Sequence, residues 1–369
     1  MVSGQSARNE RSDSRRAGAR VDRAAPSVAT SRDEPREHGR DVQEENTIVA
    51  QRGAVPNVTI RQLRQEDLAS ADRVFRLAFG TFLGLPDPEQ FGADFAQIAS
   101  RWTADPTRVF AAEADGRLVG TSVASNWGSV GFLGPITVMP EFWDEGVGTF
   151  LMAPVMQRFT AWGNRHLGLL TFPHSPKHIH LYEKFGFFPR FLTPILGREV
   201  GPHTSAATGW SAYSTLAESE RAQAIAACRA VADAVYDGLD VTCEIEAVQG
   251  QGLGDTVLLH AGSQVTGFAV CHCGEGTEAG KDVCYVKFGA VQPGAAAGPR
   301  FTRLLSACEA LAGSRGMTRL SAGVNLGCEE AYRHMRKSGF RTDFIGVALQ
   351  QPNEAGYHRP DRYVLSDWR

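Results

Sequence analysis

Residues 138–151 of the chain read VMPEFWDEGVGTFL, and this stretch decides the fold. The apolar residues that lead into it predict a buried strand, which has to end near Pro140 because proline lacks the backbone donor of a ladder. Gly146 and Gly148 follow, and the apolar residues after them recur at helical spacing. Glycines at the start of a helix let a ligand approach the backbone closely and leave amide donors facing it. With the positive end of the helix dipole, such donors favour a phosphate ligand.

A second motif lies at residues 180–187, HLYEKFGF, which predicts a helix that ends at a glycine cap before the next strand. The two motifs together resemble the GNAT superfamily of acetyl-CoA-dependent N-acetyltransferases, whose signature runs V-x-P, R/Q-x-x-G-x-G/A and L-Y-x-x-x-G-F. The positions that fit this signature are Val138, Pro140, Gly146, Gly148, Leu151, Leu181, Tyr182, Gly186 and Phe187. Trp143 stands where the family has Arg or Gln, and Asp144 and Glu145 place negative charge beside the glycines.

The resemblance implies a fold and a co-substrate. The fold is α/β, with a mixed central sheet flanked by helices, and the co-substrate is acetyl-CoA. The thioester and the pantetheine arm are expected in a gap between the strand that ends at Val138 and the strand at 166–172, where unpaired backbone groups would hold the pantetheine amides. The amide groups expected to hold the pyrophosphate are those of Gly146, Val147, Gly148 and Thr149.

Tyr182 carries the acid chemistry that the resemblance implies. Attack of an amine on a thioester needs a neutral amine, a donor at the carbonyl oxygen and a proton for the leaving thiolate. The resemblance assigns the last role to Tyr182, and a phenol suits it because it stays protonated at pH 7. The alternative is a core aromatic residue whose hydroxyl reaches the surface.

The role of Ser175 and the identity of the general base each have more than one possible assignment. Ser175 stands where the family often has an asparagine that contacts the cofactor, but it is also placed to cap a helix that begins at Pro176. No carboxylate in the strand before Pro140 presents itself as a general base. Glu141 and His174 are the candidates, since a histidine near neutrality can relay a proton through water.

Two clusters raise the question of a metal, and their patterns disfavour one. The histidines at positions 174, 178 and 180 include neighbours two apart, which point in different directions on a helix. Cys271 and Cys273 share a face of a predicted strand, but such cysteines are more often small apolar residues within a sheet. We therefore expect no metal.

The composition bounds the class of protein. A chain of 369 residues with 43% hydrophobic residues predicts about two domains with real cores. The net charge of −3 makes no case for a nucleic-acid partner. The sequence holds no apolar run long enough to span a membrane, no secretory signal, and seven cysteines that all lie at or after Cys228. We expect a cytoplasmic protein with reduced thiols.

Four segments are predicted along the chain. Residues 1–56 are rich in charge and contain no aromatic residue, which predicts a disordered tail. Residues 57–200 follow the element order of a GNAT domain, with a helix expected at 91–102 and a hairpin turn at Asp115 and Gly116. Residues 201–210 resemble a linker, and the pattern restarts over 211–369.

The two halves keep the same spacing between motifs. Pro293 follows Pro140 by 153 residues, and Gly339 follows Gly186 by the same distance. This constant offset predicts a tandem duplication, with a second GNAT-like domain at 211–369.

The second copy has lost the residues expected to bind and react. The same offset places Pro299, Arg300 and Phe301 where the first half has Gly146, Val147 and Gly148, and it places Met335 opposite Tyr182. Proline removes an amide donor and phenylalanine blocks approach to the backbone. We expect a degenerate domain that packs against the first, shapes its acceptor groove or forms a homodimer contact.

The sequence thus predicts an N-acetyltransferase that moves an acetyl group from acetyl-CoA to a primary amine by direct attack. The acceptor would be a small molecule or a peptide. The alternative is a non-catalytic GNAT-like acyl-CoA-binding or scaffold protein, which the altered positions 143–145 favour and the intact set of Gly146, Gly148 and Tyr182 disfavours.

Overall fold

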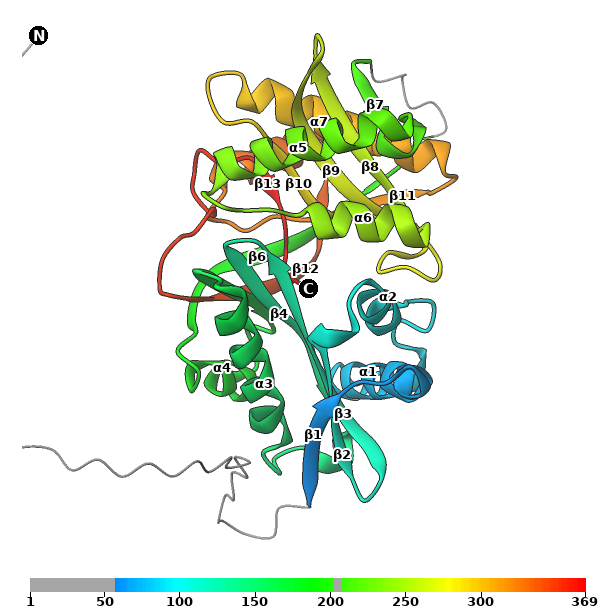
Figure 1. Cartoon of the computed structure of the whole chain (residues 1–369), viewed down its shortest axis with the longest axis vertical. Coiled ribbons are helices and arrows are strands. Elements are labelled where there is room, and N and C mark those ends of the chain that lie inside the picture. The colour runs from blue at the N-terminus through cyan, green and yellow to red at the C-terminus, as the bar shows by residue number, and fades with distance from the viewer. Residues whose placement is uncertain (1–56, 202–207) are drawn as a thin grey trace, which may run out of the picture. The chain divides into compact units, whose positions relative to one another are not determined.

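The computed structural model describes residues 57–201 and 208–369 (Figure 1). The tail predicted at 1–56 and most of the predicted linker lie outside these residues. The helices of the described chain are α1 (Leu68–Phe82), α2 (Gln97–Ala104), α3 (Val147–Trp162), α4 (Pro176–Glu183), α5 (Glu218–Val235), α6 (Thr242–Gln251), α7 (Ala297–Ser314) and α8 (Glu329–Lys337). None of these helices is both long enough and apolar enough to cross a membrane.

The strands of the described chain form one mixed sheet. They are β1 (Val58–Gln62), β2 (Val109–Ala114), β3 (Arg117–Trp127), β4 (Val130–Val138), β5 (His166–Thr171), β6 (Phe188–Glu199), β7 (Trp210–Ala212), β8 (Gly254–Ala261), β9 (Gln264–Gly274), β10 (Gly280–Val291), β11 (Arg319–Gly323), β12 (Arg341–Gln351) and β13 (Val364–Leu365). The sheet runs β1-β2-β3-β4-β5-β12-β6-β11-β10-β9-β8-β7, and β13 pairs with β10 off this path. The predicted α/β class with a mixed central sheet is confirmed.

In the middle of the sheet, each half of the chain contributes one strand that lies among the strands of the other half. β12, from the C-terminal half, lies antiparallel to β5 and β6, and β6, from the N-terminal half, pairs with β11. The sheet is therefore continuous, and the predicted division at residue 200 falls directly after a strand that belongs to the C-terminal part of the sheet. Because each half completes the sheet of the other, we expect the halves to depend on each other for stability.

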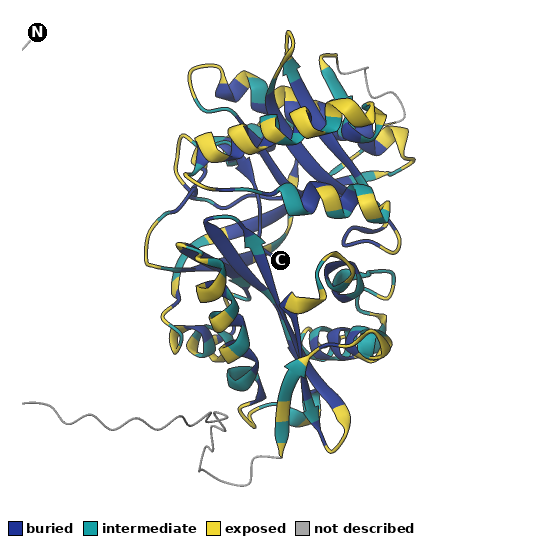
Figure 2. Cartoon of the chain, viewed as in Figure 1, coloured by how far each residue is buried: buried dark blue, intermediate teal, exposed yellow. Residues whose placement is uncertain are grey.

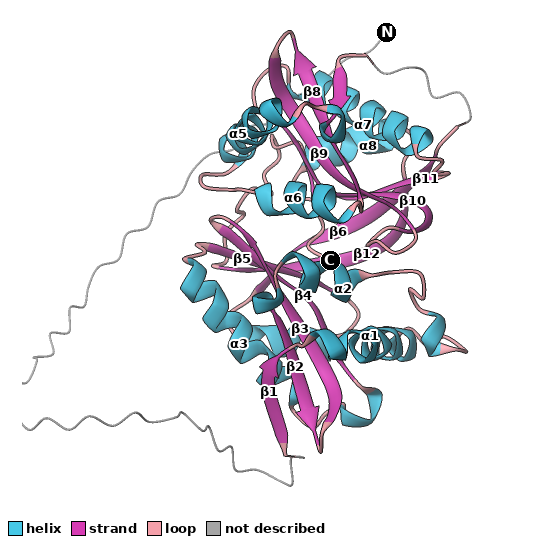
Figure 3. Cartoon of the chain, turned by 45° about the vertical axis from the view of Figure 1, so that its right-hand side comes forward, coloured by secondary structure: helices cyan, strands magenta, loops and turns pink. Residues whose placement is uncertain are grey.

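Helices cover both faces of the sheet. Figures 1 and 3 show α1 and α2 on one side of β1 to β4, with α3 and α4 on the other, and α5 and α6 opposite α7 and α8 around β8 to β11. The strands are mostly buried, whereas the helices turn exposed residues outward (Figure 2). This is the layered arrangement that amphipathic helices adopt on a sheet with two apolar faces.

The predicted hairpin turn is confirmed, and the predicted helix before it needs a correction. The turn at Asp115 and Gly116 joins β2 to β3 with φ values of 49° and 76°, as a two-residue hairpin turn requires. The helix expected at 91–102 was wrong in its extent, because α2 begins only at Gln97. The residues before it turn at Gly92, with φ of 52°, and Phe95 then forms an isolated bridge with Thr277 of the C-terminal half.

Among the residues that the structure describes, three histidines are buried: His166, His272 and His358. Burial lowers the pKa of His166 and the pKa of His272 from 6.5 to about 4. Burial also holds the pKa of His358 well below its ordinary value. All three side chains are therefore neutral in the folded protein at pH 7.

We expect the free energy of unfolding to fall as the pH is lowered from about 6.5 towards about 4. Above this window the histidines are neutral in both states, whereas within it the unfolded chain binds protons that the folded chain excludes. Each histidine contributes a slope of about 1.4 kcal/mol per pH unit. Urea unfolding at several pH values between 7 and 5 measures the slope. His272→Asn should flatten it, and His180→Asn at an exposed position should not; equal slopes in both variants would contradict this account.

Candidate active site

The strands β4 and β5 separate in the middle of the N-terminal half. They pair in parallel only as far as Leu133 opposite Leu169. Beyond this point β4 carries an irregularity in its pairing with β3, where Gly134 and Pro135 oppose Val123 alone. Such a bulge bends its strand and tolerates a proline without a backbone donor. The bend leads β4 away from β5 and opens the gap that the sequence predicts.

A cavity of about 610 Å³ occupies this gap. Six of the residues predicted to form the site line it together: Val138, Gly146, Val147, Gly148, Thr149 and Tyr182. The volume falls within the range of small-molecule and cofactor sites in proteins. Residues brought together from β4, α3 and α4 thus enclose one space between the two strands.

The start of α3 presents free amides to this cavity. Gly146 caps the helix with φ of 81°, a conformation that favours glycine. Within the described chain, the amides of Gly146, Val147 and Gly148 donate no hydrogen bond to the protein. The amide of Thr149, predicted as a fourth donor, instead donates to the carbonyl oxygen of Gly146 at 2.9 Å. Three adjacent amide donors at a helix N-terminus can bind a phosphate.

Asp144, one of the two carboxylates beside the glycines, is paired with a lysine. Lys177 pairs with Asp144 at 2.6 Å and lies over the ring of Trp143 at 5.7 Å from its centroid. The indole nitrogen of Trp143 donates to the carbonyl oxygen of Val138 at 2.8 Å. Lys177 and Lys184 both line the cavity that the free amides face, and Lys177 lies at the loop itself.

Tyr182 is buried on α4 and faces the cavity. Burial raises the pKa of Tyr182 to about 12, and the hydroxyl of Thr171 partly opposes this change. The phenol is therefore protonated throughout the physiological range.

His178 is a residue that the sequence reasoning did not assign to proton transfer. It lies one helical turn before Tyr182, on the same face of α4, and lines the same cavity. Burial lowers the pKa of His178, and Lys177 and His174 lower it further, so the imidazole is a neutral proton acceptor at pH 7. The spacing of four residues from Tyr182 is the signal that would have found it.

The other candidates lie outside the cavity lining. Ser175 caps α4, and its Oγ accepts a hydrogen bond from the amide of His178 at 3.4 Å, which is the capping role expected from Pro176. Glu141 pairs with Arg117 at 2.7 Å on the surface. His174 is exposed and stacks beside Phe82 at 5.8 Å between ring centroids.

The corresponding region of the C-terminal half is filled by side chains and by a strand. A side chain added at Gly298, in the first turn of α7, would meet the hydroxyl of Tyr363 at 3.0 Å. Phe301 is fully buried and packs against Tyr363 at 5.4 Å between centroids. Pairing of β10 with β11 ends at Val286, and β13 then pairs with β10 at Gly289 and Ala290. The described residues therefore leave no open gap between strands at this place.

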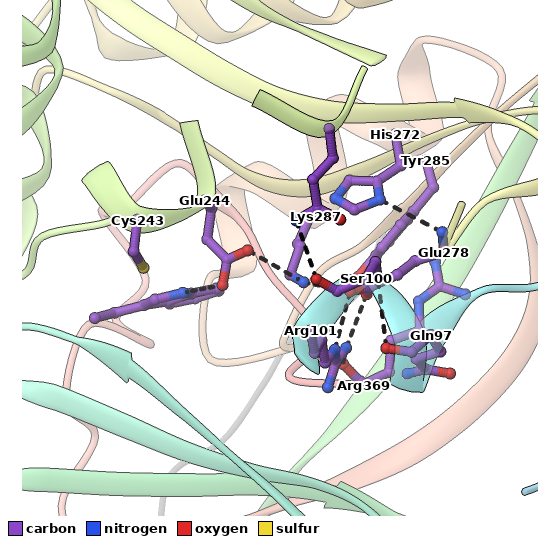
Figure 4. Close-up of polar contacts among 12 residues, drawn as sticks. Gln97, Ser100, Arg101, Cys243, Glu244, His272, Glu278, Tyr285, Lys287 and Arg369 are labelled. Carbon is purple, nitrogen blue, oxygen red and sulfur yellow. Dashed lines mark hydrogen bonds and ion pairs between the residues drawn. The ribbon is translucent and has the colours of Figure 1, made fainter. Parts of the chain in front are cut away.

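A buried cluster of charged side chains joins Arg101 of α2 to Glu278 and Lys287 of the C-terminal half (Figure 4). Arg101 of α2 donates to the carbonyl oxygen of Gly134 and, through two nitrogens, to Glu278 at 2.9 and 2.8 Å. Lys287 pairs with Glu278 at 2.5 Å and with Glu244 at 3.2 Å. Burial alone would raise the pKa of Glu278, but Arg101 and Lys287 outweigh it and hold this pKa well below its usual range.

Clusters of three or more His, Cys, Asp or Glu side chains suited to a metal ion are absent from the described part of the chain. Cys273 and Cys284 lie opposite each other on β9 and β10 with their sulfurs 3.6 Å apart.

Comparison with known proteins agrees with this geometry. Residues 71–187 match the model of the acetyltransferase (GNAT) family. A proposed acetyltransferase from Pyrococcus horikoshii superposes with a TM-score of 0.63 at 12% identity, covering 88% of this chain and 99% of that protein. A GCN5-related N-acetyltransferase from Sphaerobacter thermophilus gives a TM-score of 0.54 at 15% identity, over 81% of this chain and 96% of that one. None of the curated proteins compared with the chain matches it. Residues 71–187 therefore form a domain of the acetyltransferase (GNAT) family, in a chain whose fold over most of its length is that of solved GNAT structures.

Proposed function

We propose that this chain transfers an acetyl group from acetyl-CoA to a primary amine by direct attack. The observation that carries the proposal is the single cavity lined both by the start of α3, with its three free amides, and by Tyr182. The N-terminal segment at 57–200 supplies the catalytic side chains. The segment at 211–369 is a degenerate relative that contributes β12 to the sheet and Glu278 to the contact with Arg101.

The cofactor would be held mainly by backbone groups. The amides of Gly146, Val147 and Gly148 suit the pyrophosphate, with the hydroxyl of Thr149 beside them. Val138 suits the pantetheine arm. Its carbonyl oxygen already accepts from Trp143, but a carbonyl oxygen has a second lone pair for a pantetheine amide.

The reaction needs one proton acceptor and one proton donor, and α4 offers both. The nitrogen of the neutral amine attacks the thioester carbon, and His178 takes the proton that the amine loses. As the carbon–sulfur bond breaks, Tyr182 donates to the sulfur. A free thiol has a pKa of about 8.5, which is below the pKa of about 12 of Tyr182. Tyr182 therefore acts first as a hydrogen-bond donor to the sulfur. It gives up its proton when the departing thiolate is desolvated, because desolvation raises the pKa of the thiol.

A non-catalytic acyl-CoA-binding or scaffold protein is the second candidate. The observation that favours it is Trp143, whose side chain lines the cavity and is tied to Val138 where the family has Arg or Gln. This candidate predicts binding of acetyl-CoA with no transfer to any amine.

A thermal-shift titration with acetyl-CoA tests the cofactor site. At a concentration of 100 times the Kd, binding should stabilise the protein by about 2.7 kcal/mol. Gly148→Asp should abolish this shift, because it adds a side chain and a negative charge at the free amides. Gln157→Glu adds the same charge at an exposed position of α3 and should keep the shift. A parent protein that millimolar acetyl-CoA does not stabilise would refute the proposed function.

A further inference from the structure

The end of the cavity nearest α1 has aromatic walls. Phe79 and Phe82 of α1 and Phe172, which follows β5, line it. The ring of Phe172 lies 4.6 Å from that of Phe82 and 6.1 Å from that of Phe79, measured between centroids. Phe344 of β12 supports Phe172 from behind at 5.6 Å. These rings come from three elements and converge where the gap between β4 and β5 opens towards α1.

The same cavity lacks a negative charge that could hold an ammonium group. Among the described residues that line it, Asp144 is the sole carboxylate, and Lys177 neutralises it at 2.6 Å. Lys184 adds a further positive charge to the lining. His178 faces Phe82 with ring centroids 4.8 Å apart and is neutral at pH 7, because burial, Lys177 and His174 lower its pKa. An amine that arrives as a cation would meet cations, a neutral imidazole and apolar rings.

We infer that the acceptor carries its amine directly on a flat aromatic ring and binds in the neutral form inside the cavity, against the wall that Phe82 and Phe172 form together. This inference rests on the proposed acetyl transfer and names its substrate class. An aromatic ring delocalises the nitrogen lone pair, so such an amine is neutral at pH 7, whereas an alkyl amine with a pKa of about 10.4 is almost wholly protonated. Aromatic walls suit a flat acceptor because an aromatic ring makes favourable offset or tilted contacts with other rings, at centroid separations of about 4.5–7 Å.

The transfer balances without a further reactant. The amine nitrogen forms a bond to the acetyl carbon, and the bond from that carbon to sulfur breaks. The amine proton passes to His178, and the proton of Tyr182 passes to the CoA thiolate. The products are an aromatic acetamide and free CoA, and exchange with water returns the proton from His178 to Tyr182.

Aniline and cyclohexylamine test the inference, since they match in size and differ in aromaticity and charge. We expect kcat/KM at pH 7 to be at least 10-fold higher for aniline. The value for cyclohexylamine should rise about 10-fold per pH unit between pH 7 and 9, as its neutral fraction grows, and the value for aniline should stay level.

Variants connect this preference to the aromatic walls. Phe82→Leu and Phe172→Leu keep an apolar side chain and should lower kcat/KM for aniline about 10-fold, while that for cyclohexylamine changes less than 3-fold. Phe188→Leu, at a half-exposed residue outside the cavity, is the control and should change neither. Phe82→Glu installs the missing carboxylate and should raise the ratio of cyclohexylamine to aniline turnover. A thermal melt of each variant checks that it is folded.

The outcomes separate the acceptor class from the acetyl transfer itself. Equal or faster acetylation of cyclohexylamine overturns the aromatic acceptor, and if Phe82→Leu then abolishes that activity, the rings hold a cation instead. Stabilisation by acetyl-CoA with neither amine bound or acetylated also overturns it. A protein that acetyl-CoA does not stabilise refutes the proposed function, because that assay does not involve an acceptor.

Discussion

Tyr182→Phe is expected to lower kcat by about 100-fold or more, while the affinity for acetyl-CoA stays unchanged. The substitution removes the hydroxyl that would donate to the leaving sulfur and keeps the buried ring that packs under the cavity. Steady-state kinetics gives kcat, and a thermal-shift titration gives the affinity. Tyr213→Phe removes a hydroxyl from a buried tyrosine of the C-terminal half and should leave both values unchanged.

The pH profile of the parent adds a second check on the same assignment. Because burial raises the pKa of Tyr182 to about 12, the rate should not fall between pH 8 and 10 from loss of its proton. The rate should fall as the pH drops below the lowered pKa of His178, since a protonated imidazole cannot accept the amine proton. An unchanged kcat in Tyr182→Phe would show that another group protonates the sulfur.

Glu278→Gln is expected to reduce the free energy of unfolding by about 3–5 kcal/mol. Glu278 is almost fully buried and accepts from both Arg101 and Lys287, so glutamine would leave two buried cations with too little negative charge. The cost is the burial of unpaired charge, which exceeds the strength of any single hydrogen bond. Urea unfolding at pH 7 measures it.

Glu89→Gln provides the matched control. Glu89 pairs with Arg73 at 2.7 Å, close to the 2.8 Å that separates Arg101 from Glu278, but both partners are exposed. Water screens this pair, so its loss should cost less than about 1 kcal/mol. Similar losses in both variants would mean that burial does not set the strength of the Arg101 pair. Since Arg101 also holds the carbonyl of Gly134, we expect Glu278→Gln to weaken acetyl-CoA binding as well.

Much of the candidate site was predictable because its parts are local in sequence. The positive φ of Gly146, the free amides after it and the hairpin turn at Asp115 and Gly116 depend on neighbouring residues alone. The helix that carries Tyr182 begins at Pro176 and is capped by Ser175, as the sequence also predicts. In each case a glycine, a proline or a capping hydroxyl determines the backbone within a few residues.

The remaining features depend on contacts between distant residues. The late start of α2 follows from the bridge between Phe95 and Thr277, and the start of α7 is filled by Tyr363. The role we propose for His178 depends on the cavity that it shares with Tyr182. A local sequence pattern does not determine which distant side chain will pack against a given helix start or line a given cavity.

The amino-acid sequence alone determined the strand that ends before Pro140, the glycine-led helix after it and the position of Tyr182 on the next helix. Backbone conformation and helical spacing are properties of short segments, so they can be inferred before any packing is known. Only the tertiary structure decided that β12 and β6 exchange places in one sheet, and that aromatic rings from α1, from the residue after β5 and from β12 converge beside the gap. Sheet order and cavity walls are set by which buried surfaces pack best across the whole chain, and that choice is made between residues far apart in sequence.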